Sequence, residues 1–407
     1  ENLIKSGRKW FGERFNFDNQ QEFIFSFPNL DNNYPVSVKT SFAARSLINS
    51  TFDLKLNNQF LTTVNIPAIL SSPSSEYAKL ASSISAVNLN TSEINLSIEY
   101  FSSDAGAISW LDYIEINANR ELKMINNAMQ FRQVDYISQE IGRFEIKDAF
   151  NSRVWDVTDA TNIKELSVFF NGSSILFNDS INHIREYIIF NTNSYLVPNL
   201  QGKIYNQDLH NLSSDIEYII ISHPDFINAA NRLASFYESV QSMKVVVVTP
   251  DKIYHEFSSG MQDVTAIRDF LKMLYARINS QLRYVLLLGD GSYDPKDRVS
   301  NNTNYIPTYQ SMNSTSPTLS YVTDDYFGLL DEDEGLFLDD LVDIGIGRLP
   351  VSSLEEANSL VDKIEKYYAP FSFGSWRNDI VFIADDGDAN DGNTHMSQAD
   401  SLSNIVS

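Results

Sequence analysis

Two predicted turns combine aspartates with glycine at points where strands would end. The first is Leu288-Gly-Asp290-Gly-Ser-Tyr-Asp294 and the second is Ile383-Ala-Asp385-Asp386-Gly-Asp388. Carboxylates at such points can orient a histidine, bind a metal ion or cap the next segment, since sites in open parallel sheets form beyond the carboxyl ends of the strands. Asp-Gly is also a common turn-forming pair, and that interpretation stays open for each turn.

The densest group of carboxylates lies between residues 324 and 343, which hold nine Asp and Glu residues. These charges repel one another unless a cation or strong solvation offsets them. Calcium binds oxygen ligands in flexible loops of this kind. Asp324, Asp339 and Asp343 adjoin apolar segments, so we predict them as ligands of a structural calcium ion. Residues 331–335 are expected to form a solvated hairpin tip.

The chain contains no cysteine and only five histidines, which are scattered. No pair of histidines has the helical spacing of a zinc protease, and no nucleophile elbow or phosphate-binding glycine loop is present. We therefore expect no cofactor for catalysis within these residues.

Composition excludes some classes of partner. The 407 residues include 53 acidic and 30 basic side chains, for a net charge of −23. This balance argues against binding to nucleic acid or to anionic membranes. No apolar run approaches the length of a membrane span, and the absence of cysteine fits an exported bacterial protein without disulfides.

Residues 1 to about 200 show short runs in which apolar and polar side chains alternate, as in half-buried strands. The clearest runs are 22–27, 36–40, 52–56, 94–100 and 107–116. The pattern predicts an all-β domain of the sandwich or jelly-roll type. We expect Trp110 in its core, on the strand face of Ile108, Ile114 and Ile116.

The pattern changes near residue 205. Apolar runs at 216–222, 244–249 and 283–289 alternate with helical spacing at 226–240 and 264–278. A helix at 354–368, capped by Ser353, precedes another apolar run at 379–384. Strands that are apolar on both faces and alternate with helices predict a mostly parallel sheet. We therefore predict a β-sandwich or jelly-roll domain over 1–205 and an α/β domain over 206–407.

From about residue 216, the order of several short motifs resembles the gingipain-type family of cysteine peptidases. A strand leads into Gly289-Asp290, and Ile306-Pro307, Thr323-Asp-Asp-Tyr-Phe-Gly328, Asp343-Ile-Gly-Ile-Gly-Arg-Leu-Pro350, a long helix and Ile383-Ala-Asp-Asp386 follow. With a β-rich amino-terminal domain containing Trp10-Phe-Gly-Glu13, the chain looks most like the cell-surface sortases of the type IX secretion system in Bacteroidetes.

The resemblance implies a caspase-like fold and a Cys–His dyad that this family places further along the chain than Ser407. We therefore expect these residues alone to be inactive, with the α/β domain incomplete at its carboxyl end. Asp386 matches the acid that orients the catalytic histidine, and Asp385 is its neighbouring substitute. His395 lies near the position that sets primary specificity, where a histidine would not pair with arginine as a carboxylate does. The acidic stretch of Asp339 and Asp343 is one near which family calcium sites occur.

The resemblance also implies substrates, partners and a location. The whole enzyme would remove carboxyl-terminal secretion signals and attach the cargo to a surface lipid anchor. Its substrates would be secreted proteins with a carboxyl-terminal sorting signal, and its partner an outer-membrane protein such as a PorV-like barrel. It would be found at the cell surface, associated with the outer membrane, after export through a removed signal peptide.

Two alternatives from other classes remain open on the sequence. One is a non-catalytic surface adhesin or scaffold whose β domain binds glycan or protein. The other is a metal-dependent hydrolase that uses Asp290, Asp294 and Asp386.

Overall fold

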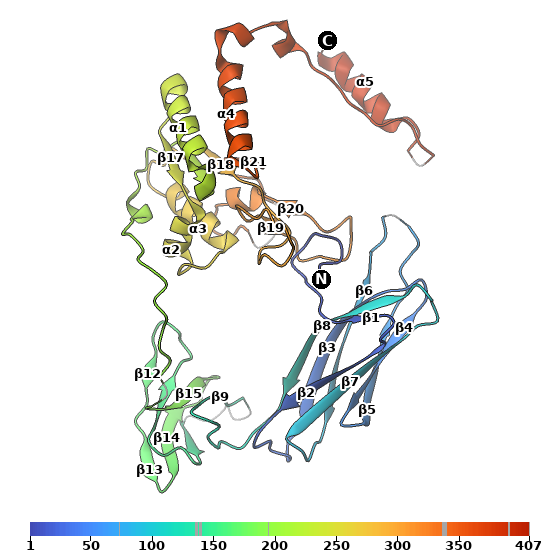
Figure 1. The fold of residues 1–407 in the computed structure, drawn as a ribbon, viewed down its shortest axis with the longest axis vertical. Helices are drawn as coiled ribbons and strands as arrows, with labels where there is room; N and C mark the ends of the chain where they lie inside the picture. The colour runs from blue at the N-terminus through green and yellow to red at the C-terminus, as the bar shows by residue number, and fades with distance from the viewer. Residues whose placement is uncertain are drawn as a thin grey trace. The chain divides into compact units, whose positions relative to one another are not determined.

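The computed structural model describes residues 1–72, 74–134, 137, 141–193, 195–335, 340–389 and 391–406. The chain forms two compact units (Figure 1). Unit 1 comprises residues 1–206 with 310–322, and unit 2 comprises 207–309 with 323–407. Unit 1 is built from antiparallel sheets and unit 2 contains a parallel sheet with helices, so the predicted fold class is confirmed.

The larger part of unit 1 pairs two four-stranded antiparallel sheets, ordered β1-β8-β3-β6 and β2-β7-β4-β5. Phe42 of one sheet stacks on Phe52 of the other, with ring centroids 4.0 Å apart. Alternating buried residues of both sheets supply the core, as the period-two pattern predicts. The strands are β1 (Arg14–Phe15), β2 (Gln20–Ser26), β3 (Val36–Arg45), β4 (Ser50–Leu56), β5 (Gln59–Ile66), β6 (Lys79–Val87), β7 (Glu93–Phe101) and β8 (Ile108–Asn117).

Trp110 is 2% exposed, so its predicted core position is confirmed. It packs with Ile108 against Phe11 and Ala43, whereas Ile114 and Ile116 contact the main sandwich core. The reason is a register shift between β3 and β8, where Ser41 pairs with Tyr113 and Phe42 pairs with Leu111. An extra residue in one strand reverses the side-chain alternation beyond it, so the predicted shared face was wrong.

A second pair of antiparallel sheets follows in unit 1, ordered β12-β11-β15-β9 and β10-β14-β13. Its core is separate from that of the larger sandwich and centres on Phe144 stacked on Phe177 at 4.7 Å. The strands are β9 (Ala128–Arg132), β10 (Ile141–Ile146), β11 (Ser152–Asp156), β12 (Lys164–Glu165), β13 (Phe169–Asn171), β14 (Ser174–Ser180) and β15 (Glu186–Asn191).

Unit 2 centres on a four-stranded parallel sheet in the order β17-β16-β18-β21. Helices α1 and α4 pack with one face of the sheet, and α2 and α3 pack with the other. Neighbouring residues of one strand therefore enter different cores: Ile220 faces α1, while Ile219 and Ile221 face α3. The strands are β16 (Tyr218–Ser222), β17 (Val245–Val248), β18 (Tyr284–Leu288) and β21 (Gly345–Leu349).

The helices of unit 2 are α1 (Ile227–Gln241), α2 (Pro250–Phe257), α3 (Val264–Tyr275), α4 (Leu354–Tyr368) and α5 (Thr394–Val406). Ser353 caps α4, since its hydroxyl accepts a hydrogen bond from the Glu356 N–H at 3.2 Å, as predicted. Shorter elements are η1 (Leu209–Asn211), η2 (Pro224–Phe226), β19 (Tyr309–Gln310), β20 (Val322–Thr323), η3 (Asp325–Gly328), η4 (Pro370–Ser372) and η5 (Ser375–Asn378).

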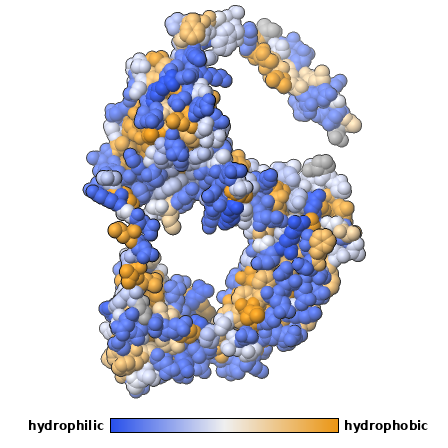
Figure 2. All heavy atoms as spheres, in the orientation of Figure 1, coloured by the Kyte–Doolittle hydropathy of each residue, from blue (hydrophilic) through white to orange (hydrophobic). Residues whose placement is uncertain are grey.

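The strand predicted at 379–384 is wrong. Those residues form no strand, and Ile380, Val381 and Ile383 are 65%, 78% and 92% exposed. Figure 2 shows hydrophobic residues at the surface among the hydrophilic ones that cover most of the visible face. The neighbour of β18 is instead β21, which sequence patterning missed. Gly345 and Gly347 interrupt its apolar pattern, because glycine has no side chain to show the alternation of a strand.

Candidate functional site

The carboxyl ends of β18 and β21 are held together by Arg348, whose side chain is 12% exposed. Its Nε and Nη2 atoms donate to the two carboxylate oxygens of Asp324, each at 2.7 Å. Its Nη1 donates to the carbonyls of Gly289 and Ile306, each at 2.9 Å. The planar guanidinium thus joins three separate loops to β21, which a lysine ammonium at the same place could not do with this geometry.

Asp290 lies in the first of the two acidic turns, and its carboxylate is hydrogen-bonded to neighbouring residues of the loop that follows β18. Its carboxylate accepts hydrogen bonds from the Thr303 hydroxyl at 2.6 Å and from the Gly291 N–H at 2.9 Å. Its backbone pairs with Ile306 and Val351. The turn-forming interpretation therefore accounts for Asp290.

Asp294 is fully buried and accepts hydrogen bonds from the N–H groups of Lys296, Arg298 and Val299. Burial raises the pKa of this carboxyl, but the N–H groups outweigh it and the pKa lies below its usual range. Asp294 thus organises the loop after β18.

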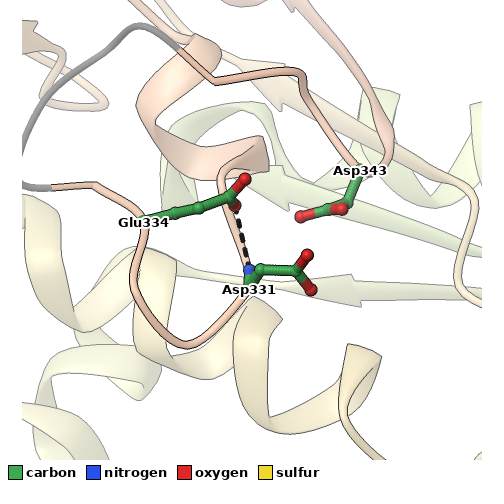
Figure 3. Close-up of side chains that lie close together, drawn as sticks. All are labelled: Asp331, Glu334 and Asp343. Atoms are coloured by element: carbon green, nitrogen blue, oxygen red, sulfur yellow. Dashed lines mark hydrogen bonds between the residues drawn. The ribbon is translucent and has the colours of Figure 1, made fainter.

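Three carboxylates gather beside α3, where Asp331, Glu334 and Asp343 each offer an oxygen within 4.8 Å of the others (Figure 3). Asp343 accepts a hydrogen bond from the Leu330 N–H at 2.8 Å, and Glu334 accepts one from the Asp331 N–H at 3.0 Å. The remaining lone pairs of these oxygens suit a hard cation such as calcium.

Two cations of α3 hold the loop that carries this cluster. Arg268 donates to the carbonyls of Leu329 at 2.6 Å and Glu334 at 2.7 Å, and Lys272 donates to the carbonyl of Asp331 at 2.8 Å. Because these contacts are made to backbone oxygens, the carboxylates stay unpaired with either cation.

The predicted calcium ligands are separated by the structure. Asp343 lies in the carboxylate cluster, Asp324 is paired with Arg348, and Asp339 lies outside the described residues. Asp331 and Glu334 were assigned to a solvated hairpin tip, yet they complete the cluster. Their spacing of three residues in a bend was the signal that could have found them.

The second acidic turn and His395, at the predicted specificity position in α5, are both exposed. Asp386 is exposed and donates its N–H to the Asp385 carboxylate at 3.0 Å. His395 pairs with Asp391 at 2.9 Å, one helical turn before it. Within the described part of the chain, Asp386 does not group with Asp290 and Asp294 as potential metal ligands.

The second half of the chain matches a known protein family. Residues 211–407 match peptidase family C25. The match and the fold confirm the resemblance to gingipain-type cysteine peptidases that the order of motifs predicted.

Two solved structures show how far the likeness extends. The crystal structure of dimeric latent PorU from Porphyromonas gingivalis shares 24% identity and a TM-score of 0.79 over 95% of this chain. The chain spans 39% of the length of that PorU. The Arg-specific cysteine proteinase gingipain R (RgpB) shares 16% identity over 48% of this chain and 39% of its own, with a TM-score of 0.32.

No curated protein matches the chain. Among the described helices, none has both the length and the apolar character that a membrane span needs.

Proposed function

We propose that this chain is part of a gingipain-type cysteine peptidase that acts as a sortase of the type IX secretion system. One observation carries the proposal: residues 211–407 match peptidase family C25. Within them, Asp324 and Arg348, from two of the motifs that carry the resemblance, meet as a bidentate pair at the carboxyl edge of the sheet. This edge is where open parallel sheets build their sites, and it lies in the region that matches peptidase family C25.

The proposed chemistry is attack of a cysteine thiolate on a peptide carbonyl, which forms an acyl-enzyme that a second nucleophile then resolves. Residues 1–407 hold no cysteine. In the proposal, the nucleophilic cysteine and the histidine that activates it lie outside these residues. In the proposal, Asp386 or Asp385 orients that histidine, and His395 contributes to specificity. The fragment by itself is proposed to be inactive.

The proposal includes a structural calcium ion bound by Asp331, Glu334 and Asp343. It is supported by their mutual distance and by the oxygen chemistry of the set. The ion would stabilise the loop that Arg268 and Lys272 hold, and no catalytic step is assigned to it.

In this proposal the whole protein resides at the cell surface, associated with the outer membrane. Its substrates are secreted proteins with a carboxyl-terminal sorting signal, and a PorV-like barrel is its outer-membrane partner. The excess of acidic residues fits a surface protein that binds no nucleic acid.

The proposal is tested with the full-length protein and a secreted substrate that carries a carboxyl-terminal signal. We expect signal removal to be abolished by a thiol-alkylating reagent and by replacement of the single cysteine that the reagent labels. Residues 1–407 alone should leave the substrate intact.

The result that contradicts the proposal is processing that resists alkylation but stops when divalent ions are chelated. That outcome would favour a metal-dependent hydrolase. Transfer of the cargo to a surface lipid acceptor, read by mass spectrometry, separates a sortase from a simple peptidase.

A further inference from the structure

A cavity of 620 Å³ opens at one end of the larger sandwich in unit 1. It is lined by Arg45 at the end of β3 and the two residues after it, by residues 69–72 and 75–77 between β5 and β6, by the turn between β7 and β8, and by Pro317 of the 310–322 segment. Pockets that bind small ligands have volumes of this order.

Arg45 is the cation of this cavity, and its guanidinium is held in place. The group stacks over the Tyr77 ring at 4.3 Å from the centroid and donates through Nη1 to the Tyr77 carbonyl at 3.2 Å. Tyr77 is fixed in turn, since its N–H donates to the Thr315 carbonyl at 2.6 Å. A stacked guanidinium keeps its N–H edge available for a planar acceptor, as in bidentate binding of a carboxylate.

The two acids that line the cavity are already engaged. Asp104 accepts hydrogen bonds from the N–H groups of Leu47 at 2.8 Å and Gly106 at 2.9 Å. Glu76 forms a salt bridge with Lys79. Among the residues that the structure describes, Arg45 has no such carboxylate partner, so the cavity offers an unpaired cation in a chain of net charge −23.

The walls beside Arg45 are aliphatic. Leu47 and Leu70 are 57% and 74% exposed, and Ile69 also lines the cavity. A sugar would need an open aromatic face to stack on, but Arg45 covers a face of the Tyr77 ring. The combination suits a carboxylate that has an aliphatic group next to it.

We propose that this cavity binds the free carboxyl terminus of a peptide whose last residue is aliphatic. The terminal carboxylate pairs with Arg45, and the aliphatic side chain contacts Leu47 and Leu70. The site belongs to the β-sandwich and does not depend on the proposed peptidase chemistry.

The test is calorimetric titration of residues 1–407 with acetyl-Gly-Gly-Leu, with its carboxyl-terminal amide, and with glucuronate. We expect the acid to bind about tenfold or more tightly than the amide, because only the carboxylate can accept the charge-assisted pair. Equal affinity of acid and amide overturns the proposal, and so does the absence of binding to the acid. Tighter binding of glucuronate would assign the cavity to acidic sugars instead.

Three variants locate the binding. Arg45→Gln should weaken binding of the acid about tenfold, whereas Arg14→Gln, which removes the same charge from an exposed position on β1, should change it less than about twofold. Leu70→Ser should weaken binding of acetyl-Gly-Gly-Leu but not of acetyl-Gly-Gly-Gly. The midpoints of urea unfolding check that each variant folds. If Arg45→Gln does not fold, Leu70→Ser still tests the proposal. Equal effects of the two arginine variants overturn the assignment to Arg45.

Discussion

Two regions of unit 2 carry motifs of the same family resemblance: the carboxyl edge of the parallel sheet and residues 379–396. They differ in the hydrogen bonds that join them to the rest of the unit. Around Arg348, side chains and carbonyls of four segments are joined by hydrogen bonds. Residues 379–387 form no hydrogen bond to the described sheet, and Asp386 is exposed. The motifs around Arg348 are thus held together within these residues, whereas the stretch that carries Asp386 is exposed to solvent.

The largest expected effect is at Arg348. Arg348→Met leaves Asp324 and two carbonyls without their donor. Because this ion pair is only partly buried, we expect a loss of about 2–3 kcal/mol, below the roughly 3–5 kcal/mol that breaking a fully buried pair costs. Urea unfolding of unit 2 measures it. Arg283→Met is the control, since Arg283 is 59% exposed and pairs with Glu217 at the surface, where such pairs contribute about 1 kcal/mol or less. Equal losses in both variants would show that the edge is not braced.

Calcium is expected to stabilise unit 2 through the Asp331, Glu334 and Asp343 cluster. At a calcium concentration one hundred times the dissociation constant, the gain is about 2.7 kcal/mol. Differential scanning calorimetry with and without calcium measures it. Asp343→Asn should remove the gain, whereas Asp340→Asn, an exposed neighbour, should keep it. A gain that persists in Asp343→Asn contradicts the assignment.

Asp294 should make the stability of the loop after β18 depend on pH. Because its pKa is lowered in the folded protein, its contribution is present above the unfolded value of about 3.9 and is lost as the pH falls through the folded pKa. The stability gap between the wild type and Asp294→Asn should therefore be about 2 kcal/mol at pH 7 and should narrow as the pH falls through the folded pKa of Asp294. Asp297→Asn, an exposed neighbour, is the control. A gap of constant size across this range would count against the loop assignment.

A smaller effect is expected at the start of α4. Ser353→Ala removes the cap and should cost about 1 kcal/mol in urea unfolding. Ser359→Ala makes the same replacement at an exposed position inside α4 and should be neutral or slightly stabilising. Equal unfolding free energies of the two variants would show that the Ser353 cap does not contribute to stability.

The smallest effect is expected in the open stretch. Asp386→Asn and His395→Ala should each change the unfolding free energy of residues 1–407 by less than about 0.5 kcal/mol, because both side chains are exposed. Under the proposed function, Asp386→Asn in the full-length protein should instead lower the rate of signal removal, since the proposed catalytic histidine would lose its orienting acid. A large stability loss in the fragment would assign a structural role to Asp386.

The sequence predicted the elements whose periodicity is clean. The apolar runs at 216–222 and 283–289 are covered on both faces, and β16 and β18 lie in the centre of the sheet. The glycines of β21 concealed an edge strand, and the apolar run at 379–384 suggested a strand that does not form. Periodicity reports whether a segment can be buried but does not identify its neighbour.

The site residues were harder to place, because their partners are distant in sequence. Asp324 was assigned to a metal ion on local charge, and its true partner Arg348 lies in a different motif. Asp331 and Glu334 were set aside as solvated, although the bend between them brings their carboxylates to Asp343. The local sequence shows that neighbouring carboxylates repel one another. Only the fold shows which carboxylate forms an ion pair with an arginine from another motif.

Amide hydrogen exchange on residues 1–407 tests most directly whether the carboxyl edge is braced and the later stretch is open. We expect strong protection of the Gly289, Asp290 and Ile306 amides, which donate within the edge, and exchange near the unfolded rate for 380–385. We also expect Arg348→Met to remove the protection of Ile306 before that of Ile220 in the centre of β16. Equal protection of the edge and of 380–385 would contradict a braced edge beside an open stretch.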